Sequence, residues 1–342
     1  MPTLVELIEQ QQGAIIARFV SEVQQQALAP VDLPRPLLID ALPAFLSELT
    51  TELTSHSRVQ SSQDAGDTSA SARQHGEQRW SLGYNLEALI REYGVLRHSV
   101  VEAVKDAGGA FSADQMDVLA KRLNVAVSEA VSAYVSFRDA QLDSEKANLR
   151  FLVEASELLS SSLDYRSTLR RLADLCVPRI ADWCVVHLED QSVDDMPIAH
   201  VDPSKVAAVR SVYHTYPPPS DSPHGYAAAI RNGEAELVGH VESGLFEKVA
   251  HDPEHLALLR SLDACSWLVV PLRLQNAVFG ALTLVYSESK RRYAASDATL
   301  AGELARRAAI AIDNARLYQR SEEERSRVEA ATRAKDEFAG VL

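Results

Sequence analysis

The stretch at residues 266–287 reads SWLVVPLRLQNAVFGALTLVYS and contains the clearest strand signals of the sequence. It holds two apolar runs, Ser266–Leu274 and Val278–Ser287, on either side of the short break Gln275-Asn276-Ala277. Apolar runs of this length with so short a break are typical of a β-hairpin buried inside a sheet. We therefore predict a hairpin at the centre of a sheet.

Weaker signals of the same kind precede the hairpin. Strands are predicted at Trp183–Leu188, Pro197–Val201 and Ala235–Val238. Short helices are predicted at Leu169–Val177, Ser204–Tyr213 and Tyr226–Ile230. Residues 242–262 are expected to be irregular, and Ser296 is expected to cap a helix that leaves the domain. This order predicts an α+β domain with a central antiparallel sheet, entered and left by long helices.

The first 140 residues predict an all-α domain, because apolar side chains recur there at helical spacing. The serine-rich segment Ser61–Ser71 is expected to be a loop, and Asn85 is expected to cap the fourth helix. Ser112 and Gln115 form a capping-box signature. Nothing breaks the pattern from there to about Ser162, so we predict one long helix.

Two helical stretches carry the spacing of a coiled-coil seam. The seam of the long helix includes Leu142, Leu149, Leu152 and Leu159. The seam of the exit helix includes Leu317, Val328, Ala331, Phe338 and Leu342. These seams predict a parallel homodimer joined by signalling helices; the alternative for the first seam is packing on its own domain. The polar residues Asn314, Ser321 and Glu324 weaken the second seam, which suits a switch.

These signals divide the chain into four parts. We expect a helical domain at 1–140, a coiled-coil linker at 141–163, the α+β domain at 164–318 and a C-terminal signalling helix at 319–342.

Composition excludes several classes of partner. The chain has 342 residues, with 34 Lys and Arg against 48 Asp and Glu, and a net charge of −14. This charge disfavours nucleic acid and anionic membranes. The apolar runs are too short to span a bilayer and no secretory signal precedes them, so a cytoplasmic protein is expected. The three cysteines, Cys176, Cys184 and Cys265, fit free thiols.

Four segments of the α+β part resemble a GAF domain, the small-molecule sensor fold of many signalling proteins. They are FLVEASELLSSSLDY at 151–165, ADWCVV at 181–186, VVPLRLQNAVFGALTL at 269–284 and AIAIDNARLY at 309–318. The resemblance implies an α+β sensor with a pocket for a small molecule.

The N-terminal part is similar to the non-haem, globin-like sensor domain of RsbT co-antagonist (stressosome) proteins. The residues that carry the match are His75, Arg79, Gly83-Tyr84, Leu86, Leu89-Ile90, Glu92-Tyr93 and Leu96-Arg97. The resemblance implies a globin-like fold, dimerisation and the sensing of an unknown stimulus, and it does not imply catalysis.

The C-terminal residues 335–342, KDEFAGVL, resemble the start of the dimerisation and phosphoacceptor helix of bacterial histidine kinases. This resemblance implies the input region of a cytoplasmic two-component sensor histidine kinase, with the phosphoacceptor histidine and the ATP-binding domain beyond the sequence. The implied partner is a response regulator, reached through the kinase domain. The 342 residues by themselves are not expected to catalyse a reaction, whereas the full-length kinase would be an enzyme. Alternatives are an input module for a phosphatase or a diguanylate cyclase, and a stressosome-like scaffold.

Candidate binding residues lie near the irregular stretch of the α+β domain. His224, Tyr226, His240 and Trp267 are aromatic or polar groups that could line a ligand pocket against the sheet. The alternative is that they are ordinary core and loop residues.

No cofactor or metal is expected, and ATP is expected only in the kinase domain. The pair His251 and His255 offers too few ligands for zinc, and Pro253 is expected to prevent the helix that would align them. His75 and His98 are the haem candidates of the N-terminal domain, but both lie beside charged residues. No Cys-His pair is present to attach a bilin.

Overall fold

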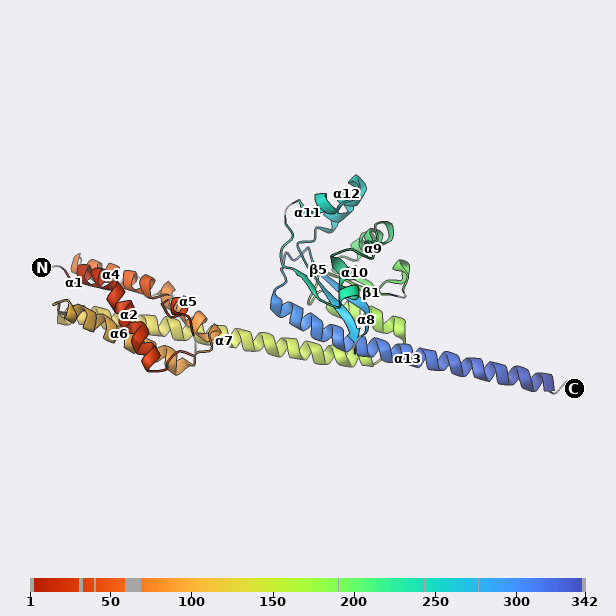
Figure 1. Ribbon diagram of the computed structural model, residues 1–342, viewed down its shortest axis with the longest axis horizontal. Helices are drawn as coiled ribbons and strands as arrows, with labels where there is room; N and C mark the ends of the chain where they lie inside the picture. The colour runs from red at the N-terminus through yellow and green to blue at the C-terminus, as the bar shows by residue number, and fades with distance from the viewer. Residues whose placement is uncertain are drawn as a thin grey trace. The chain divides into compact units, whose positions relative to one another are not determined.

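The computed structural model describes residues 3–30, 33–39, 41–58, 69–189, 191–242, 244–275 and 277–339 (Figure 1). The chain divides into two compact units, Met1–Lys146 and Ala147–Leu342. In the described part of the chain, no helix is long and apolar enough to cross a membrane.

The first unit is built from helices, as its periodicity predicts. Its helices are α1 (Leu4–Gln10), α2 (Gln12–Gln25), α3 (Arg35–Ile39), α4 (Leu42–Arg58), α5 (Ala70–Ser81), α6 (Leu86–Asp106) and the first part of α7 (Ala113–Ser160). The predicted caps are confirmed. Asn85 accepts a hydrogen bond from the Ala88 amide at 2.8 Å, and Ser112 and Gln115 bond reciprocally. Most of the predicted loop Ser61–Ser71 lies outside the described residues.

A buried ionic group ties three helices of this unit together. Glu92 Oε2 on α6 accepts a hydrogen bond from Arg79 Nε at 2.8 Å and lies 3.1 Å from His75 Nε2, both on α5. The Arg79 guanidinium also donates to the carbonyls of Leu37 and Leu38 on α3. Burial raises the pKa of Glu92, but the hydrogen bond from His75 and the charge of Arg79 outweigh burial and hold it below its usual value.

The second unit contains the predicted sheet. Its strands are β1 (Trp183–Leu188), β2 (Ile198–His200), β3 (Glu236–Val238), β4 (Ser266–Leu274) and β5 (Ala277–Tyr286). All neighbours are antiparallel, in the order β2-β1-β5-β4-β3. The predicted hairpin is confirmed as β4 and β5, and β5 is the middle strand of the five.

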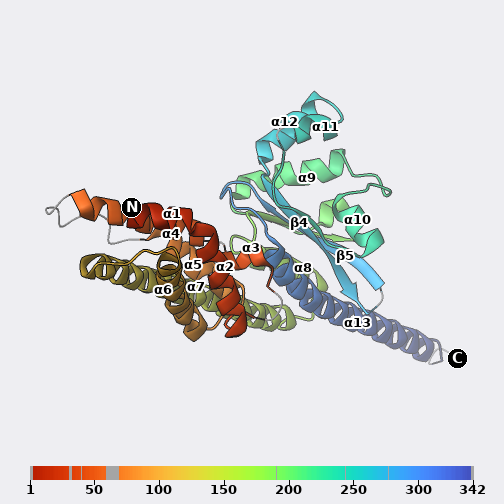
Figure 2. The same cartoon turned by 60° about the vertical axis from the view of Figure 1, so that its left-hand side comes forward.

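The two faces of the sheet pack against different helices (Figure 2). One face packs against the end of α7, α8 (Tyr165–Cys176) and α13 (Ala295–Ala339) through residues such as Leu268 and Leu284. The opposite face packs against α9 (Val206–Thr215), α10 (Gly225–Asn232) and α12 (Pro253–Leu262). Two 3-10 turns, η1 (Val193–Asp195) and η2 (Pro203–Lys205), and the short helix α11 (Leu245–Val249) complete the unit. Because side chains alternate along a strand, adjacent residues of β4 and β5 serve opposite faces.

Residues 242–262 differ from the prediction, because two helices lie where an irregular stretch was expected. Pro253 is the first residue of α12 and starts it, rather than preventing it, because the first helical position needs no amide donor. Asp252 caps this helix by accepting a hydrogen bond from the His255 amide at 2.8 Å.

The exit helix also begins differently from the prediction. Ser296 is not its cap, because α13 already begins at Ala295. The carboxylate of Asp297 accepts a hydrogen bond from the Ala294 amide at 2.8 Å, so this amide at the start of the helix has a partner.

Two of the four leucines assigned to the seam of the long helix need a correction. Leu152 and Leu159 are buried in the core of the second unit with Phe151 and Ala155, so they are not available to a partner helix. Leu142 and Leu149 are exposed, with 40% and 64% of their surface accessible. Helical spacing shows that a stripe is apolar but does not identify what covers it.

Candidate functional site

A cavity of about 540 Å³ lies on the face of the sheet opposite α13. Trp183, Trp267, Val269, Thr283 and Val285 of β1, β4 and β5 form its floor. The cover comes from α9 (Val212, Tyr213), α11 (Leu245, Phe246, Val249) and α12 (Leu259, Leu262). A volume of this size is typical of sites for small organic molecules.

The four residues predicted to line a pocket all line this cavity. Trp267 comes from β4 and Tyr226 from α10, and both are partly buried. His224 and His240 are exposed and lie toward the solvent side. His224 Nδ1 lies 3.2 Å from Glu236 Oε1, and Glu236 also accepts a hydrogen bond from the Gly225 amide.

A histidine that the sequence analysis did not select holds the aromatic part of the wall in place. His187, on β1, stacks on Tyr226 with ring centroids 3.8 Å apart and an interplanar angle of 3°, and it contacts Tyr213 edge-on at 4.9 Å. Burial lowers the pKa of His187 to about 3, so its ring is neutral near pH 7. The sequence signal that could have identified His187 is its place as the one histidine of the otherwise apolar strand WCVVHL.

One polar group of the cavity floor has no protein partner. The Trp183 indole Nε1 is buried and makes no hydrogen bond within the described part of the chain. Unpaired buried donors are rare in proteins because each costs about 1–3 kcal/mol. The nitrogen has almost no accessible surface, so a molecule in the cavity would reach it only if the floor moved.

The cover is fastened by an aromatic cluster at the start of α12. Tyr216, at the end of α9, stacks on His255 at 4.0 Å and donates a hydrogen bond to the Asp252 carboxylate at 3.1 Å. His251 Nδ1 lies 3.0 Å from His255 Nδ1, so the two imidazoles bond to each other. Among the described residues, no group of three or more His, Cys, Asp or Glu side chains is placed to hold a metal ion.

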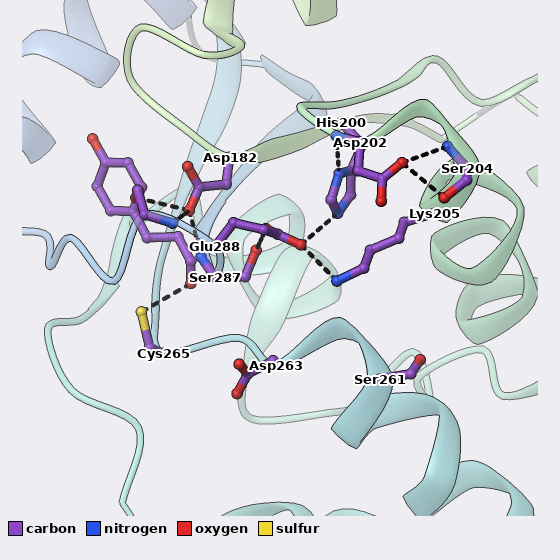
Figure 3. Close-up of polar contacts among 12 residues, drawn as sticks. Asp182, His200, Asp202, Ser204, Lys205, Ser261, Asp263, Cys265, Ser287 and Glu288 are labelled. Atoms are coloured by element: carbon purple, nitrogen blue, oxygen red, sulfur yellow. Dashed lines mark hydrogen bonds and ion pairs between the residues drawn. The ribbon is translucent and has the colours of Figure 1, made fainter.

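A second polar cluster lies at the start of β1 and the ends of β2 and β5 (Figure 3). Asp182 Oδ2 accepts three hydrogen bonds, from the amides of Ser287 and Ser289 and from the Ser289 hydroxyl, at 2.7–2.9 Å. Glu288 pairs with Lys205 at 2.7 Å and lies 3.7 Å from His200 Nε2 (Figure 3). This cluster fastens the loop after β5 to the start of β1, and we assign it a structural role.

The cysteines do not line this cavity, and the haem candidates belong to the first unit. Cys176 and Cys184 are buried in the core on the α13 side of the sheet, and the Cys265 thiol donates to the Tyr286 carbonyl at 3.2 Å. In the first unit, His75 contacts Glu92, and the exposed His98 lies 3.7 Å from Glu22. The expectation of no cofactor stays a prediction.

The remaining seam residues lie on α13 or beyond it. Leu317 and Val328 have 55% and 65% of their surface accessible. Ala331 and Phe338 belong to α13, and Leu342 lies outside the described residues. Dimerisation through these residues stays a prediction.

The α+β unit can be placed in a known family. A family model, described as "GAF domain", matches residues 162–313. Residues 162–313 form a GAF domain. GAF domains are sensory and signalling modules that commonly bind small molecules and dimerise. The match is confined to these residues, so the expectations of a globin-like first unit and of a kinase remain predictions.

Solved structures with similar folds cover about half of the chain. Free methionine-R-sulfoxide reductase from Neisseria meningitidis, in complex with its substrate, is 19% identical; the match covers 50% of this chain and 91% of that one (TM-score 0.35). The GAF-B domain of DevS from Mycobacterium smegmatis is 18% identical, with coverages of 46% and 99% (TM-score 0.33). The GAF domain of a phosphoenolpyruvate-protein phosphotransferase from Coxiella burnetii is 17% identical, with coverages of 50% and 96% (TM-score 0.37). These likenesses are too low for functional inference. No curated protein matches the chain.

Proposed function

We propose that the chain is the sensory input region of a cytoplasmic two-component sensor histidine kinase. In this proposal the GAF domain binds a small molecule, and α13 carries the resulting change to a histidine kinase domain. The observation that supports it best is that the cavity and α13 share the same two strands. Thr283 and Val285 of β5 line the cavity, while Leu282 and Leu284 pack in the core that contains α13.

This arrangement gives a ligand a short mechanical path to the output helix. A ligand shifts a conformational equilibrium only if it binds one state more tightly than the other. A molecule that contacts both the floor and the cover of the cavity would favour the state in which they fit around it. Any shift of β4 or β5 then repositions Leu304 and Ile312 of α13, which are fully buried against the sheet.

The output side of the proposal rests on the sequence of α13. This helix continues from the GAF core to Ala339 without a break. It includes most of the segment KDEFAGVL, which resembles the start of a kinase phosphoacceptor helix. In the proposal, two copies pair along α13, and a small change in their packing controls autophosphorylation of the histidine. The partner that receives the phosphate is a response regulator, and the first unit supplies a second input.

The identity of the output can be tested on the natural gene product. If the coding sequence continues past Leu342 with Ser-His-Glu and an ATP-binding domain, the purified product should label itself with radioactive ATP. Replacing the predicted histidine by Gln should abolish the label. A phosphatase or a diguanylate cyclase domain at this place would overturn the kinase proposal, and so would large shell-like oligomers.

The dimeric helix can be tested by single-cysteine cross-linking. In a Cys265→Ser background, Val328→Cys and Phe338→Cys lie on the proposed seam, and Ser326→Cys lies on another side of the same helix. We expect oxidative cross-links at both seam positions and much weaker cross-linking at the control. Equal, negligible yields at both seam positions would refute the dimeric helix.

A further inference from the structure

The inner walls of the GAF cavity offer mainly apolar surface. Val269 and Val285 belong to its floor, and Leu245, Phe246 and Leu259 belong to its cover. The three cover residues are only partly buried, so part of their apolar surface is accessible to a molecule inside the cavity. An apolar molecule that covers this surface removes it from water, which favours binding in proportion to the area covered.

Four polar side chains of the inner walls are not available to a ligand. The Tyr213 hydroxyl bonds to Thr283, and the Tyr216 hydroxyl donates a hydrogen bond to the Asp252 carboxylate at 3.1 Å. The Trp183 indole nitrogen has almost no accessible surface. A charged or strongly polar group in the inner part of the cavity would lose its water without gaining these partners, and that loss weakens binding.

The charged groups of the lining give an ion little compensation for its lost water. Glu236 Oε1 already lies 3.2 Å from His224 Nδ1, and Glu236 also accepts a hydrogen bond from the Gly225 amide. Glu242 and His240 are exposed, so water screens any charge that they carry. Among the described lining residues no Lys or Arg appears. The lining therefore favours a ligand without charge over a cation or an anion.

We propose that this cavity binds an uncharged, largely hydrocarbon molecule of two or three rings. The inference rests on the proposed function in that both place the sensed molecule in the GAF domain, and it names the class of that molecule. A volume of about 540 Å³ accommodates a molecule of this size. The molecule contacts the floor strands β4 and β5 and the cover helices α11 and α12, and these apolar contacts supply most of its binding energy.

A matched pair of fluorescent probes tests the preference against an anion. N-phenyl-1-naphthylamine and 8-anilino-1-naphthalenesulfonate share one ring system, and only the second carries a sulfonate. Titration of the full chain should give one neutral probe bound per chain, at least about tenfold more tightly than the sulfonate. Equal or tighter binding of the sulfonate, or no binding of the neutral probe, would overturn the proposal.

A matched pair of competitors tests the preference against a cation. 2-(1-Naphthyl)ethanol is uncharged, whereas 2-(1-naphthyl)ethylamine carries an ammonium group at pH 7 and is otherwise similar in size. Both are added to the chain with the neutral fluorescent probe bound. The alcohol should displace the probe at a concentration about threefold or more below that of the amine. More effective displacement by the amine would overturn the uncharged class.

Variants that add a ring to the lining locate the bound probe. Ala264→Phe, before β4, and Val249→Trp, on α11, both fill part of the cavity and should weaken the neutral probe by about fivefold or more. The control is Ala207→Phe, at an exposed position of α9 outside the lining, which should keep the parent affinity. Circular dichroism checks the fold of each variant.

The two filling variants are independent because they lie on different elements. If both fold and both keep the parent affinity, the probe binds elsewhere and the proposal is overturned; if one fails to fold, the other decides. Failure of these titrations leaves the cross-linking and autophosphorylation results unaffected, so the ligand class and the proposed function fail separately.

Discussion

The imidazole of His187 lies flat against the ring of Tyr226, with centroids 3.8 Å apart and an interplanar angle of 3°. The first residue belongs to β1 and the second to α10, so the stack fastens a helix of the cavity wall to the sheet. Because burial holds the pKa of His187 at about 3, this contact depends on an uncharged ring. Protonation of the ring would place an unpaired charge in the core.

The first prediction concerns pH. A histidine in the unfolded chain has a pKa of about 6.5. Above that pH, His187 is neutral in both the folded and the unfolded protein, and its contribution to stability is complete. As pH falls below 6.5, the unfolded state takes up a proton that the folded state rejects, and stability is lost. The loss from His187 should reach about 2 kcal/mol at pH 5.

The measurement is urea unfolding at pH 7.5 and pH 5, followed by tryptophan fluorescence in a Trp80→Phe background. Two of the chain's three tryptophans, Trp183 and Trp267, then report on the GAF domain. His187→Phe keeps an aromatic stack and should remove this part of the pH dependence, whereas the exposed His98→Gln should not. The same pH dependence in His187→Phe and the parent would contradict the prediction.

The second prediction concerns the close approach of β1 and β5. A Cβ atom at Gly280 would lie 2.3 Å from the His187 carbonyl oxygen, far inside contact distance. Gly280→Ala should therefore destabilise the GAF domain by about 1–3 kcal/mol. The control is Gly302→Ala on α13, where nothing lies within 4 Å, which should stabilise by about 1 kcal/mol. The urea concentration at the midpoint of unfolding measures both effects. An unchanged midpoint in Gly280→Ala would show that the two strands separate easily.

The third prediction concerns the ionic group of the helical unit. Glu92→Ala leaves the fully buried Arg79 without its carboxylate partner, which should cost about 3–5 kcal/mol. Glu129→Ala breaks the ion pair with Arg73, whose side chain is 58% exposed, and should cost less than about 1 kcal/mol. Thermal unfolding by circular dichroism compares the two. Similar costs for both variants would mean that Arg79 finds other partners.

The hairpin of β4 and β5 was predictable almost to the residue because both its faces are buried. Such strands are continuous apolar runs, and a local pattern is enough to recognise them. The helices at Leu245–Val249 and Pro253–Leu262 were missed because they are short and partly exposed, so their periodicity is weak.

The candidate site was predictable only in part, for a different reason. Tyr226 and Trp267 stand out as aromatic residues near a long connection. Trp183 and Thr283 are unremarkable strand residues until the register pairs Trp183 with Val285 and Thr283 with both Val185 and Val269. The pairing of β1 with β5 brings together residues about a hundred positions apart, which local periodicity does not specify.

The last prediction separates folding from dimerisation on α7. Leu159 is 1% exposed in the GAF core, so Leu159→Ala should cost about 2–5 kcal/mol of stability. Leu149 is 64% exposed on the same helix, so Leu149→Ala should leave the stability of an isolated chain nearly unchanged. If two copies pair along this helix, Leu149→Ala should instead weaken their association. Sedimentation equilibrium over a range of concentrations measures that effect apart from unfolding. An unchanged dimer constant in Leu149→Ala would exclude this leucine from the interface, and a monomeric parent chain would remove the dimer from the mechanism.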